Sequence, residues 1–493
     1  MRAKHSANDQ IVQVGARVRS IVWFRGKDLR LADHQPLAAG IAAGEVLPVF
    51  IFDPYFFAPE RAVQMGHRIQ FLLESAQALK AALQARGSDL ICLRGASFDR
   101  LAELSRAWSA DRVLATRWSE RFGRKRDDSI ASRLQVPFHV FEGETLMPPG
   151  DILTASGQAF RVFTPFWRAF QRVFELKAPL PRPERLPSLP PEILALDEGI
   201  PGLEELGVVA NERLIRGGEQ AAWSRLDTFL RGPADRYVKG RDRLDQEGTS
   251  RLSADLKFGL LSPRQVWWAI ETAEARPGGG AAFQRQLVWR EFSHHSLWHW
   301  PDLLERPFRA DFEGFPWLED PAGWQAWVQG QTGYPVVDAA ARQLLVEGFV
   351  HNRARMIAAS FLTKHLGIHY QRGEAHYMRY LVDGDWAQNN LGWQWSAGCG
   401  CDAQPYFRVF NPTLQGQRFD PAGTYVRQWV PELARLPKRW IHEPWNAPES
   451  VLLDAGVTLA KDYPKPIVEH RAARARFLAT AKAHLAQRKG LSP

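Results

Sequence analysis

The stretch at residues 383–395 concentrates side chains that could do chemistry. It reads DGDWAQNNLGWQW and holds two carboxylates, two adjacent asparagine carboxamides and three indoles. Asp385 and Asn389 have the spacing of neighbours on one side of a helix. Carboxamides beside large aromatic rings suit a site that holds a flat heteroaromatic ring and hydrogen-bonds its edge. For any single residue, a polar helix start followed by core tryptophans is the simpler explanation.

Two further motifs lie upstream of this stretch. Residues 248–253, GTSRLS, offer hydroxyls and backbone donors and lead into a helical pattern at residues 254–259. Free N–H groups at a helix start, together with Ser and Thr hydroxyls, form an anion site, whereas an ordinary N-cap by Ser253 needs no ligand. Residues 351–356 read HNRARM. The three motifs in this order resemble the photolyase/cryptochrome family of flavoproteins, from about residue 19 to about residue 485.

The resemblance implies that the C-terminal half binds FAD. The residues that match the family's diphosphate-binding positions are Tyr237, Thr249, Ser250, Arg251, Leu252 and Ser253. Arg355 and Asp383 match an ion pair beside the flavin ring, and such a pair, when buried, must be satisfied on both sides. Asp383 and Asp385 match positions that contact the ribityl chain and the polar atoms of the ring. The remaining implied cofactor contacts are Phe283, Arg290 and Asn352.

Asn389 matches the family position that faces N5 of the flavin. An Asp at this position could hand N5 a proton and favour a neutral semiquinone. An Asn carries no acidic proton, which fits an enzyme that needs the fully reduced, anionic flavin. This position therefore favours an enzyme over a photoreceptor.

The resemblance also implies a pocket for damaged DNA next to the flavin. The implied catalytic residues are Gln286, Trp289, Asn352, Met356 and Asn389, and the implied DNA contacts are Arg241, Trp289, Arg353, Met356 and Arg408. Trp289 can stack on an extruded base, which is worth roughly 1–3 kcal/mol, and Met356 is an adaptable apolar surface. Asn352 and Met356 match enzymes that act on cyclobutane dimers, whereas the related (6-4) enzymes carry catalytic histidines there. Any one of the arginines alone also fits a solvated helix face.

Two positions of this pocket depart from the family pattern. Gln286 stands where cyclobutane-dimer enzymes usually have Glu. A Gln donates a hydrogen bond but cannot transfer a proton, so we expect slower or less efficient repair. Phe283 stands where Trp is usual, which thins the aromatic wall.

The chain of aromatic residues that would carry electrons to the flavin departs as well. Trp393 and Trp317 match its inner and outer members, but Tyr370 occupies the middle position. Tyr oxidation normally requires proton loss, so this link is kinetically harder. Trp386 is then a candidate substitute carrier, although a plain core residue is the alternative.

The resemblance further implies a light-harvesting chromophore in the N-terminal half, through WFRGKDLR at residues 23–30. Folate-binding relatives have Asn and Glu where this chain has Phe122 and Gly123, and Cys and Lys where it has Leu304 and Glu305. Bound methenyltetrahydrofolate is therefore not expected. A deazaflavin, another flavin or no second chromophore remain as alternatives beside FAD.

The order of apolar segments predicts two domains. Short buried-strand runs at residues 20–24, 46–52, 90–93, 113–115 and 138–141 alternate with helical patterns such as 67–86, which predicts an α/β doubly wound parallel sheet. From residue 223 the periodicity is helical, which predicts an all-α flavin-binding domain. The expected division is a tail at 1–18, an α/β antenna-binding-like domain at 19–150, a linker at 151–222 with a proline-rich stretch, and a helical FAD- and DNA-binding domain at 223–493.

Composition sets the remaining expectations. The net charge of +9 and the pI near 9.5 suit a polyanionic partner. Three cysteines do not make a disulfide framework, which favours a reducing cytoplasm. The sequence shows neither a membrane-spanning apolar run nor a signal peptide. We expect a cytoplasmic monomer that binds damaged DNA, without a membrane or an obligate protein partner.

Two functions compete. The first is light-driven repair of cyclobutane pyrimidine dimers in DNA, a carbon–carbon lyase reaction in which excited reduced FAD passes an electron to a flipped-out dimer. The second is a cryptochrome-like blue-light photoreceptor with weak or no repair. Gln286, Phe283 and Tyr370 motivate the second, whereas Asn389 and the short segment after His484 oppose it. A flavin-free helical DNA-binding protein is a third alternative, which the set of flavin motifs opposes.

Overall fold

The computed structural model describes residues 17–273 and 278–490, so the predicted tail lies almost wholly outside the described residues. The N-terminal half contains a five-stranded parallel sheet with strand order β3-β2-β1-β4-β5. The strands are β1 (Val18–Phe24), β2 (Gly44–Phe52), β3 (Ile91–Arg94), β4 (Arg112–Thr116) and β5 (Phe138–Phe141). All five apolar runs form strands. Strands that are covered on both faces are apolar along most of their length, and this is why the runs predicted them. The predicted doubly wound sheet is confirmed.

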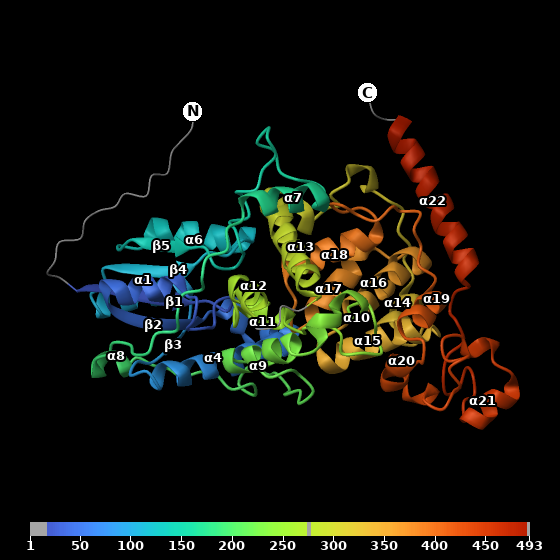
Figure 1. The fold of residues 1–493 in the computed structure, drawn as a ribbon, viewed down its shortest axis with the longest axis horizontal. Coiled ribbons are helices and arrows are strands. Elements are labelled where there is room, and N and C mark those ends of the chain that lie inside the picture. Colours follow the sequence, from blue (N-terminus) through green and yellow to red (C-terminus); the bar gives the residue numbers. More distant parts are fainter. Residues whose placement is uncertain (1–16, 274–277, 491–493) are drawn as a thin grey trace.

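Both faces of the sheet are covered. Val22 and Phe24 of β1 pack into one apolar cluster, and the alternate residues Ile21 and Trp23 pack into another. The first cluster continues into the helical half, so the sheet and the helices share one core. Figure 1 shows the sheet on the left and most of the helices on the right. The helices that accompany the strands are α1 (Gln35–Ala43), α2 (Pro54–Phe57), α3 (Pro59–Ala62), η1 (Val63–Met65), α4 (Gly66–Gln84), α5 (Ser97–Ala107) and α6 (Arg121–Arg133).

The segment at residues 151–222 is more structured than the linker that the prolines predict. It contains α7 (Phe163–Val173) and α8 (Pro191–Leu194). Its extended parts follow the surface of the α/β half, where the backbone N–H of Asp33 donates to the carbonyl of Leu180 at 2.9 Å. Helix α7 packs against α13 (Gly280–His299) of the helical half. The segment therefore ties the two halves together.

The helical half surrounds a second apolar cluster. Besides α13, its elements are α9 (Glu219–Leu230), η2 (Pro233–Arg236), α10 (Tyr237–Gly240), α11 (Ser253–Phe258), α12 (Pro263–Thr272), η3 (Pro301–Leu304), η4 (Ala310–Phe312), α14 (Pro321–Gln329), α15 (Pro335–Glu347), α16 (Asn352–Phe361), the π-helical turn η5 (Leu362–Leu366), α17 (Tyr370–Tyr380), α18 (Trp386–Ala397), α19 (Pro412–Phe419), α20 (Thr424–Trp429), η6 (Pro431–Leu433), η7 (Pro444–Asn446), α21 (Glu449–Ala455) and α22 (His470–Gly490). Among the helices described, we find none with the length and apolar character that a bilayer crossing requires.

The two halves meet where the loop after β1 abuts the end of α11. The backbone N–H of Leu29 donates to the carbonyl of Phe258 at 3.2 Å, and Nη1 of Arg30 donates to the carbonyl of Gly259 at 3.0 Å. Gly259 has a φ of 63°, and a Cβ there would lie 1.9 Å from the carbonyl oxygen of Lys27. Only glycine allows this approach. The carboxyl edge of the sheet is therefore held against the helical half.

Candidate functional site

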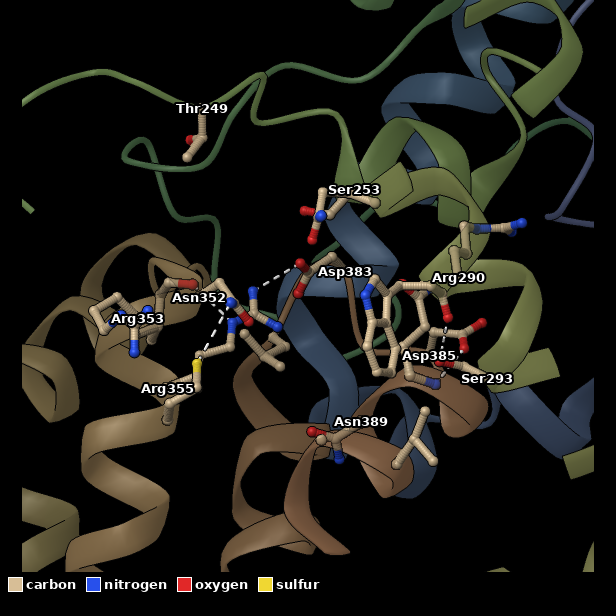
Figure 2. Close-up of a pocket in the computed structure, with 18 of the residues that line it drawn as sticks. Thr249, Ser253, Arg290, Ser293, Asn352, Arg353, Arg355, Asp383, Asp385 and Asn389 are labelled. Carbon is tan, nitrogen blue, oxygen red and sulfur yellow. Dashed lines mark hydrogen bonds and ion pairs between the residues drawn. The ribbon is translucent and has the colours of Figure 1, made fainter. Parts of the chain in front are cut away.

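A cavity with a volume of about 510 Å³ opens among residues 248–253 and helices α13, α16 and α18 (Figure 2). This volume is typical of small-molecule and cofactor sites. The predicted site residues that line it are Tyr237, Arg241, Thr249, Ser250, Arg251, Leu252, Ser253, Gln286, Trp289, Arg290, Asn352, Arg353, Arg355, Met356, Asp383, Asp385, Asn389 and Trp393. The three motifs, which are far apart in the sequence, thus meet around one space.

Five predicted residues lie outside the cavity lining, namely Phe283, Trp317, Tyr370, Trp386 and Arg408. Phe283 is buried against Phe229 and Tyr237, with ring centroids 4.6 Å and 5.2 Å away. It supports the wall from behind Tyr237 and does not form it, so the expectation that Phe283 contacts the cofactor finds no support in this geometry. Arg408 is exposed on the loop after α18, beyond the cavity.

The cavity also contains residues that the sequence analysis missed. These are Asp242, Ser293, Phe349, Val350, Ala359, Tyr377, Leu381, Gln388, Leu391, Gly392, Trp395 and Ser396. Helical spacing could have found Ser293, which follows Trp289 by four positions. The apolar members carry no such signal, because their pattern matches that of ordinary core residues.

The predicted ion pair is present at the cavity wall. Nη2 of Arg355 lies 2.7 Å from Oδ2 of Asp383, and its Nε donates to the carbonyl of Val350 at 2.7 Å (Figure 2). Asp383 is buried and Arg355 is mostly covered. The other carboxylate oxygen, Oδ1 of Asp383, is buried without a hydrogen-bond partner among the described residues. The pair is therefore fixed on one side and open to a ligand donor on the other.

Asp385 is held at the start of α18. Its Oδ1 accepts a hydrogen bond from the backbone N–H of Gln388 at 3.0 Å, which caps the helix. Its Oδ2 has no hydrogen-bond partner among the described residues but lies 4.0 Å from Nζ of the buried Lys27. Burial raises the pKa of this carboxyl, but the nearby His294, Lys27 and Arg290 more than offset this and hold the pKa below its ordinary value. Asp385 is therefore an ionised acceptor at the wall.

The segment at residues 248–253 is not an ordinary helix cap. Leu252 occupies the N-cap of α11, and no side chain caps that helix, so the alternative in which Ser253 acts as the N-cap is wrong. Arg251 has a left-handed φ of 52°, which is unusual for a residue other than glycine. Its guanidinium pairs with Glu347 at 3.0 Å and lies over the ring of Phe349. The side chain thus fixes the turn while the hydroxyls of Thr249, Ser250 and Ser253 line the cavity.

Unpartnered buried atoms test whether this site fits FAD. Besides Oδ1 of Asp383, Nε of Arg251 and Nε of Arg353 are buried without a hydrogen-bond partner among the described residues. A buried polar group without a partner costs free energy, so these atoms indicate a polar ligand. FAD carries a diphosphate, a polyol chain and a polar ring edge, and it can offer partners along its whole length. These hydrogen-bond donors and acceptors therefore fit the cofactor that the resemblance implies.

The amide of Asn389 is held in one orientation. Its Nδ2 donates to the carbonyl of Glu374 on α17 at 3.0 Å. The neighbouring Asn390 donates to the carboxyl of Glu374 at 3.1 Å and to the carbonyl of Leu303 at 2.8 Å. Because α17 fixes both amides, Asn389 presents a neutral, preorganised group to the cavity.

The aromatic, apolar and amide side chains of the cavity lining suit a flat, uncharged ligand. Trp289 stacks on Phe163 of α7, with ring centroids 3.7 Å apart and an interplanar angle of 8°. Met356 also lines the cavity and accepts a long contact from the amide of Asn352 at 3.7 Å. The only amide hydrogen bond of Gln286 within the described residues is a 3.5 Å contact with the carbonyl of Ala282. The amide of Gln286 therefore remains available to a ligand.

The rings around Trp393 indicate a path for electron transfer to the cavity that the sequence analysis did not consider. Trp393 lines the cavity and lies 6.1 Å from Trp327, which stacks at 5.6 Å on the half-buried Trp324. Trp386 is 47% exposed and has no ring contact among the described aromatic residues, so it is not the core residue of the alternative interpretation. The detour through Trp386 is not supported by this geometry.

Tyr370 is poorly placed to replace a tryptophan. Its ring contacts Trp317 at 6.4 Å but has no ring contact with Trp393 among the described residues. Its hydroxyl is buried without a partner there. Burial raises the pKa of this hydroxyl far above its ordinary value. If Tyr370 were oxidised, no described residue would be in place to accept the proton of its hydroxyl.

We expect Trp327→Phe to slow the photoreduction of bound flavin more than Tyr370→Phe does, because Trp327 lies on the continuous ring path. Transient absorption of the flavin after a blue flash, with an external electron donor, measures the rate. Trp386→Phe is the control, since it removes an exposed indole that has no ring contact with the described aromatic residues. A larger effect of Tyr370→Phe than of Trp327→Phe would refute the path through Trp327.

Both halves of the chain are similar to known proteins. Residues 20–184 match the family model described as DNA photolyase, and residues 283–483 match the model described as the FAD binding domain of DNA photolyase. A deoxyribodipyrimidine photo-lyase of Thermus thermophilus is 43% identical and covers 84% of this chain and 92% of its own length.

Solved structures agree with this assignment. A class III photolyase of Agrobacterium tumefaciens superposes with a TM-score of 0.87 at 37% identity and covers 97% of this chain and 99% of its own. A cryptochrome of Synechocystis superposes with a TM-score of 0.83 at 29% identity and covers 94% of this chain and 100% of its own. The α/β half and the helical half are thus those of a single known architecture, and the cavity lies within its FAD-binding domain. This chain belongs to the DNA photolyase family.

Proposed function

We propose that this protein repairs cyclobutane pyrimidine dimers in DNA in a light-driven lyase reaction. Bound, fully reduced FAD supplies the electron that opens the dimer and takes it back. The observation that carries the proposal is one cavity shared by Arg355, Asp383 and Asn389 of the flavin motifs and by Trp289 and Met356 of the implied lesion pocket. Because these residues line one cavity, an electron donor and a lesion bound by them would lie at short range.

Each side chain has a proposed task in this reaction. The ion pair of Arg355 and Asp383 and the carboxylate of Asp385 orient the ring and the polyol chain of the cofactor. Residues 248–253 and Tyr237 hold the diphosphate. In the lesion pocket, Trp289 stacks on the extruded pyrimidines, and the amide of Gln286 donates a hydrogen bond to a pyrimidine carbonyl.

Damaged DNA is the proposed partner. Extruding a damaged base costs less than extruding a paired one, which contributes to selectivity. Arg241 and Arg353 line the cavity, and Arg353 pairs with Asp242 at 2.9 Å. With the exposed Arg408, they are the proposed phosphate contacts. We further propose that the protein acts as a cytoplasmic monomer without an obligate protein partner, divided as expected at residues 150 and 222.

A second chromophore remains part of the proposal, but not a folate held as in folate-binding relatives. A Cβ at Gly123 would lie 2.5 Å from Cβ of Trp118, so a Glu there requires Trp118 to move. Phe122 stacks on Tyr55 with ring centroids 4.6 Å apart, which occupies the other position. The identity of a second chromophore follows from mass analysis of the chromophores that the denatured protein releases.

The repair reaction is tested with reduced protein and an oligonucleotide that contains a single thymine dimer. We expect dimer loss over several turnovers under near-ultraviolet or blue light and none in the dark. Chromatography of the oligonucleotide measures the dimer content, and an undamaged oligonucleotide in equal amount controls for nonspecific photochemistry. Tight dimer binding without dimer loss on illumination would rule out the enzyme.

Photoreception without repair is the second candidate. It is favoured by Gln286, which lacks the carboxyl of the usual Glu, and by the similarity to the Synechocystis cryptochrome structure. The same illumination assay separates the two functions. A photoreceptor binds FAD and undergoes photoreduction, yet leaves the dimer content unchanged.

A further inference from the structure

Three loops at the carboxyl edge of the sheet place buried charges next to the cavity. Lys27 follows β1, Glu120 follows β4 and Glu144 follows β5. Nζ of Lys27 lies 2.5 Å from Oε1 of Glu120, forms a second ion pair with Glu144, and lies 4.0 Å from Oδ2 of Asp385. The exposed fraction of each of these four side chains is 8% or less. A cation from the α/β half thus lies directly behind the cavity wall.

A metal ion is the obvious alternative occupant of this cluster. Ligand atoms of Glu144, His294 and Asp385 lie within 4.8 Å of one another, as they would around a cation. However, the ammonium of Lys27 already pairs with Glu144, and Nδ1 of His294 is 2.8 Å from the hydroxyl of Ser119. Lys27 therefore already supplies the positive charge beside these carboxylates. A metal ion bound there would be repelled by its ammonium.

The charges of the cluster depend on one another. Burial raises the pKa of Glu144, but Lys27 and His294 more than offset this and lower it to about 2. Burial lowers the pKa of Lys27, but Glu120, Glu144 and Asp385 raise it above its ordinary value. Burial lowers the pKa of His294 to about 4, so this ring is neutral at neutral pH. Arg290 and the half-buried Lys257 are the other cations near Asp385.

The backbone around Lys27 packs closely against the helical half. Gly26 has a left-handed φ of 70°, which turns the chain toward the helical half. The carbonyl of Lys27 abuts Gly259 at the end of α11, and the other end of α11, Ser253, lines the cavity. The backbone of Lys27 is therefore held against α11, whose first residue lines the cavity.

We propose that Lys27 is a positioning residue of the flavin site. Its ammonium, supplied by the α/β half, compensates Glu144 and Asp385 and so keeps the Asp385 carboxylate ionised and oriented at the cavity wall. This inference deepens the proposed function and rests on its flavin site, but it does not depend on the repair reaction. Buried charges are stable only when they are compensated, and removing one member of such a set leaves the others uncompensated.

The test is the affinity of the apoprotein for FAD, measured by flavin fluorescence in the dark and without DNA. We expect Lys27→Met to weaken FAD binding by about 10-fold or more, because Glu120, Glu144 and Asp385 lose their shared cation. The matched control is Lys80→Met. Lys80 also pairs with two carboxylates, Asp89 at 2.8 Å and Asp197 at 2.9 Å, in the α/β half and away from the cavity lining. Its loss should leave the FAD affinity unchanged.

A second variant separates charge compensation from loss of folding. In Lys27→Met/Glu144→Gln one of the uncompensated carboxylates is also removed, so we expect part of the lost FAD affinity to return. A purely structural role of Lys27 predicts the opposite, because the double variant lacks still more contacts. If the single variant does not fold, recovery of FAD binding in the double variant supports the proposal, and its absence overturns it.

The reduction potential gives an independent readout. Without Lys27 the anionic reduced flavin should lose more affinity than the oxidised form, and the two-electron potential should fall by about 30 mV for each tenfold difference. Wild-type affinity and potential in Lys27→Met would overturn the proposal. Loss of repair in the wild-type protein, together with the expected FAD affinities, would overturn the proposed function and leave this inference intact.

Discussion

Replacing Arg355 by Met is expected to abolish stable retention of FAD. Asp383 is buried, and its Oδ2 has Arg355 as its 2.7 Å partner, so the variant leaves an uncompensated carboxylate beside the flavin ring. Breaking a buried pair on one side costs about 3–5 kcal/mol, and a loss of this size in FAD binding corresponds to about two to three and a half orders of magnitude in affinity. Flavin absorbance per mole of purified protein and titration of the apoprotein measure the effect.

Two further variants identify the cause of this loss. Arg342→Met is the matched control, because Arg342 pairs with Glu432 at 2.7 Å in the same half with similar coverage but outside the cavity lining. It should lower the thermal stability and leave the FAD content unchanged. Arg355→Met/Asp383→Asn removes the uncompensated charge and should bind FAD more tightly than Arg355→Met does. Equal FAD content in Arg355→Met and the wild type would contradict this role of the ion pair.

Replacing Trp289 by Ala is expected to weaken binding of dimer-containing DNA without changing its salt dependence. The indole already stacks on Phe163, so its remaining surface is held in place for an extruded base. Loss of one base–aromatic stack costs roughly 1–3 kcal/mol, or about 5- to 150-fold in the dissociation constant. Fluorescence anisotropy with damaged and undamaged oligonucleotides at several salt concentrations measures both quantities.

The salt series distinguishes stacking from charge. The slope of log K against log salt counts phosphate contacts, so Trp289→Ala should retain the wild-type slope, whereas Arg241→Gln should reduce it by about one contact for damaged and undamaged DNA alike. Trp223→Ala removes a half-buried tryptophan on α9, outside the cavity lining, as the control for general destabilisation. An unchanged preference of Trp289→Ala for damaged DNA would show that the base does not stack there.

Local patterns predicted the elements of this fold well. The helix expected at residues 67–86 forms as α4, and the strands fall on the expected apolar runs, because burial determines both periodicities. The stretch at residues 151–222 was less predictable. Its proline content indicates extended chain, but the amphipathic residues of α7 also form a helix that packs on α13.

The site was predictable where its residues belong to motifs and less so elsewhere. Tertiary packing decides whether a residue reaches the wall, and spacing does not contain that information. Phe283 stands behind Tyr237, and Trp386 is exposed although helical spacing relates it to Asn389. Lys27 and Glu144 could not have been assigned to the site, because they are more than two hundred positions from Asp385 and only the folded chain brings them together.

The contact of Gly259 with the carbonyl of Lys27 has a consequence for domain exchange. A side chain at residue 259 would push apart the segment at 25–30 and helix α11, and the displacement would reach the cavity from both directions. A chimera that joins the sheet of one relative to the helices of another therefore needs partners that match at this seam. The fold has two domains, but the contact at Gly259 couples them. A change in one domain at this contact requires a matching change in the other.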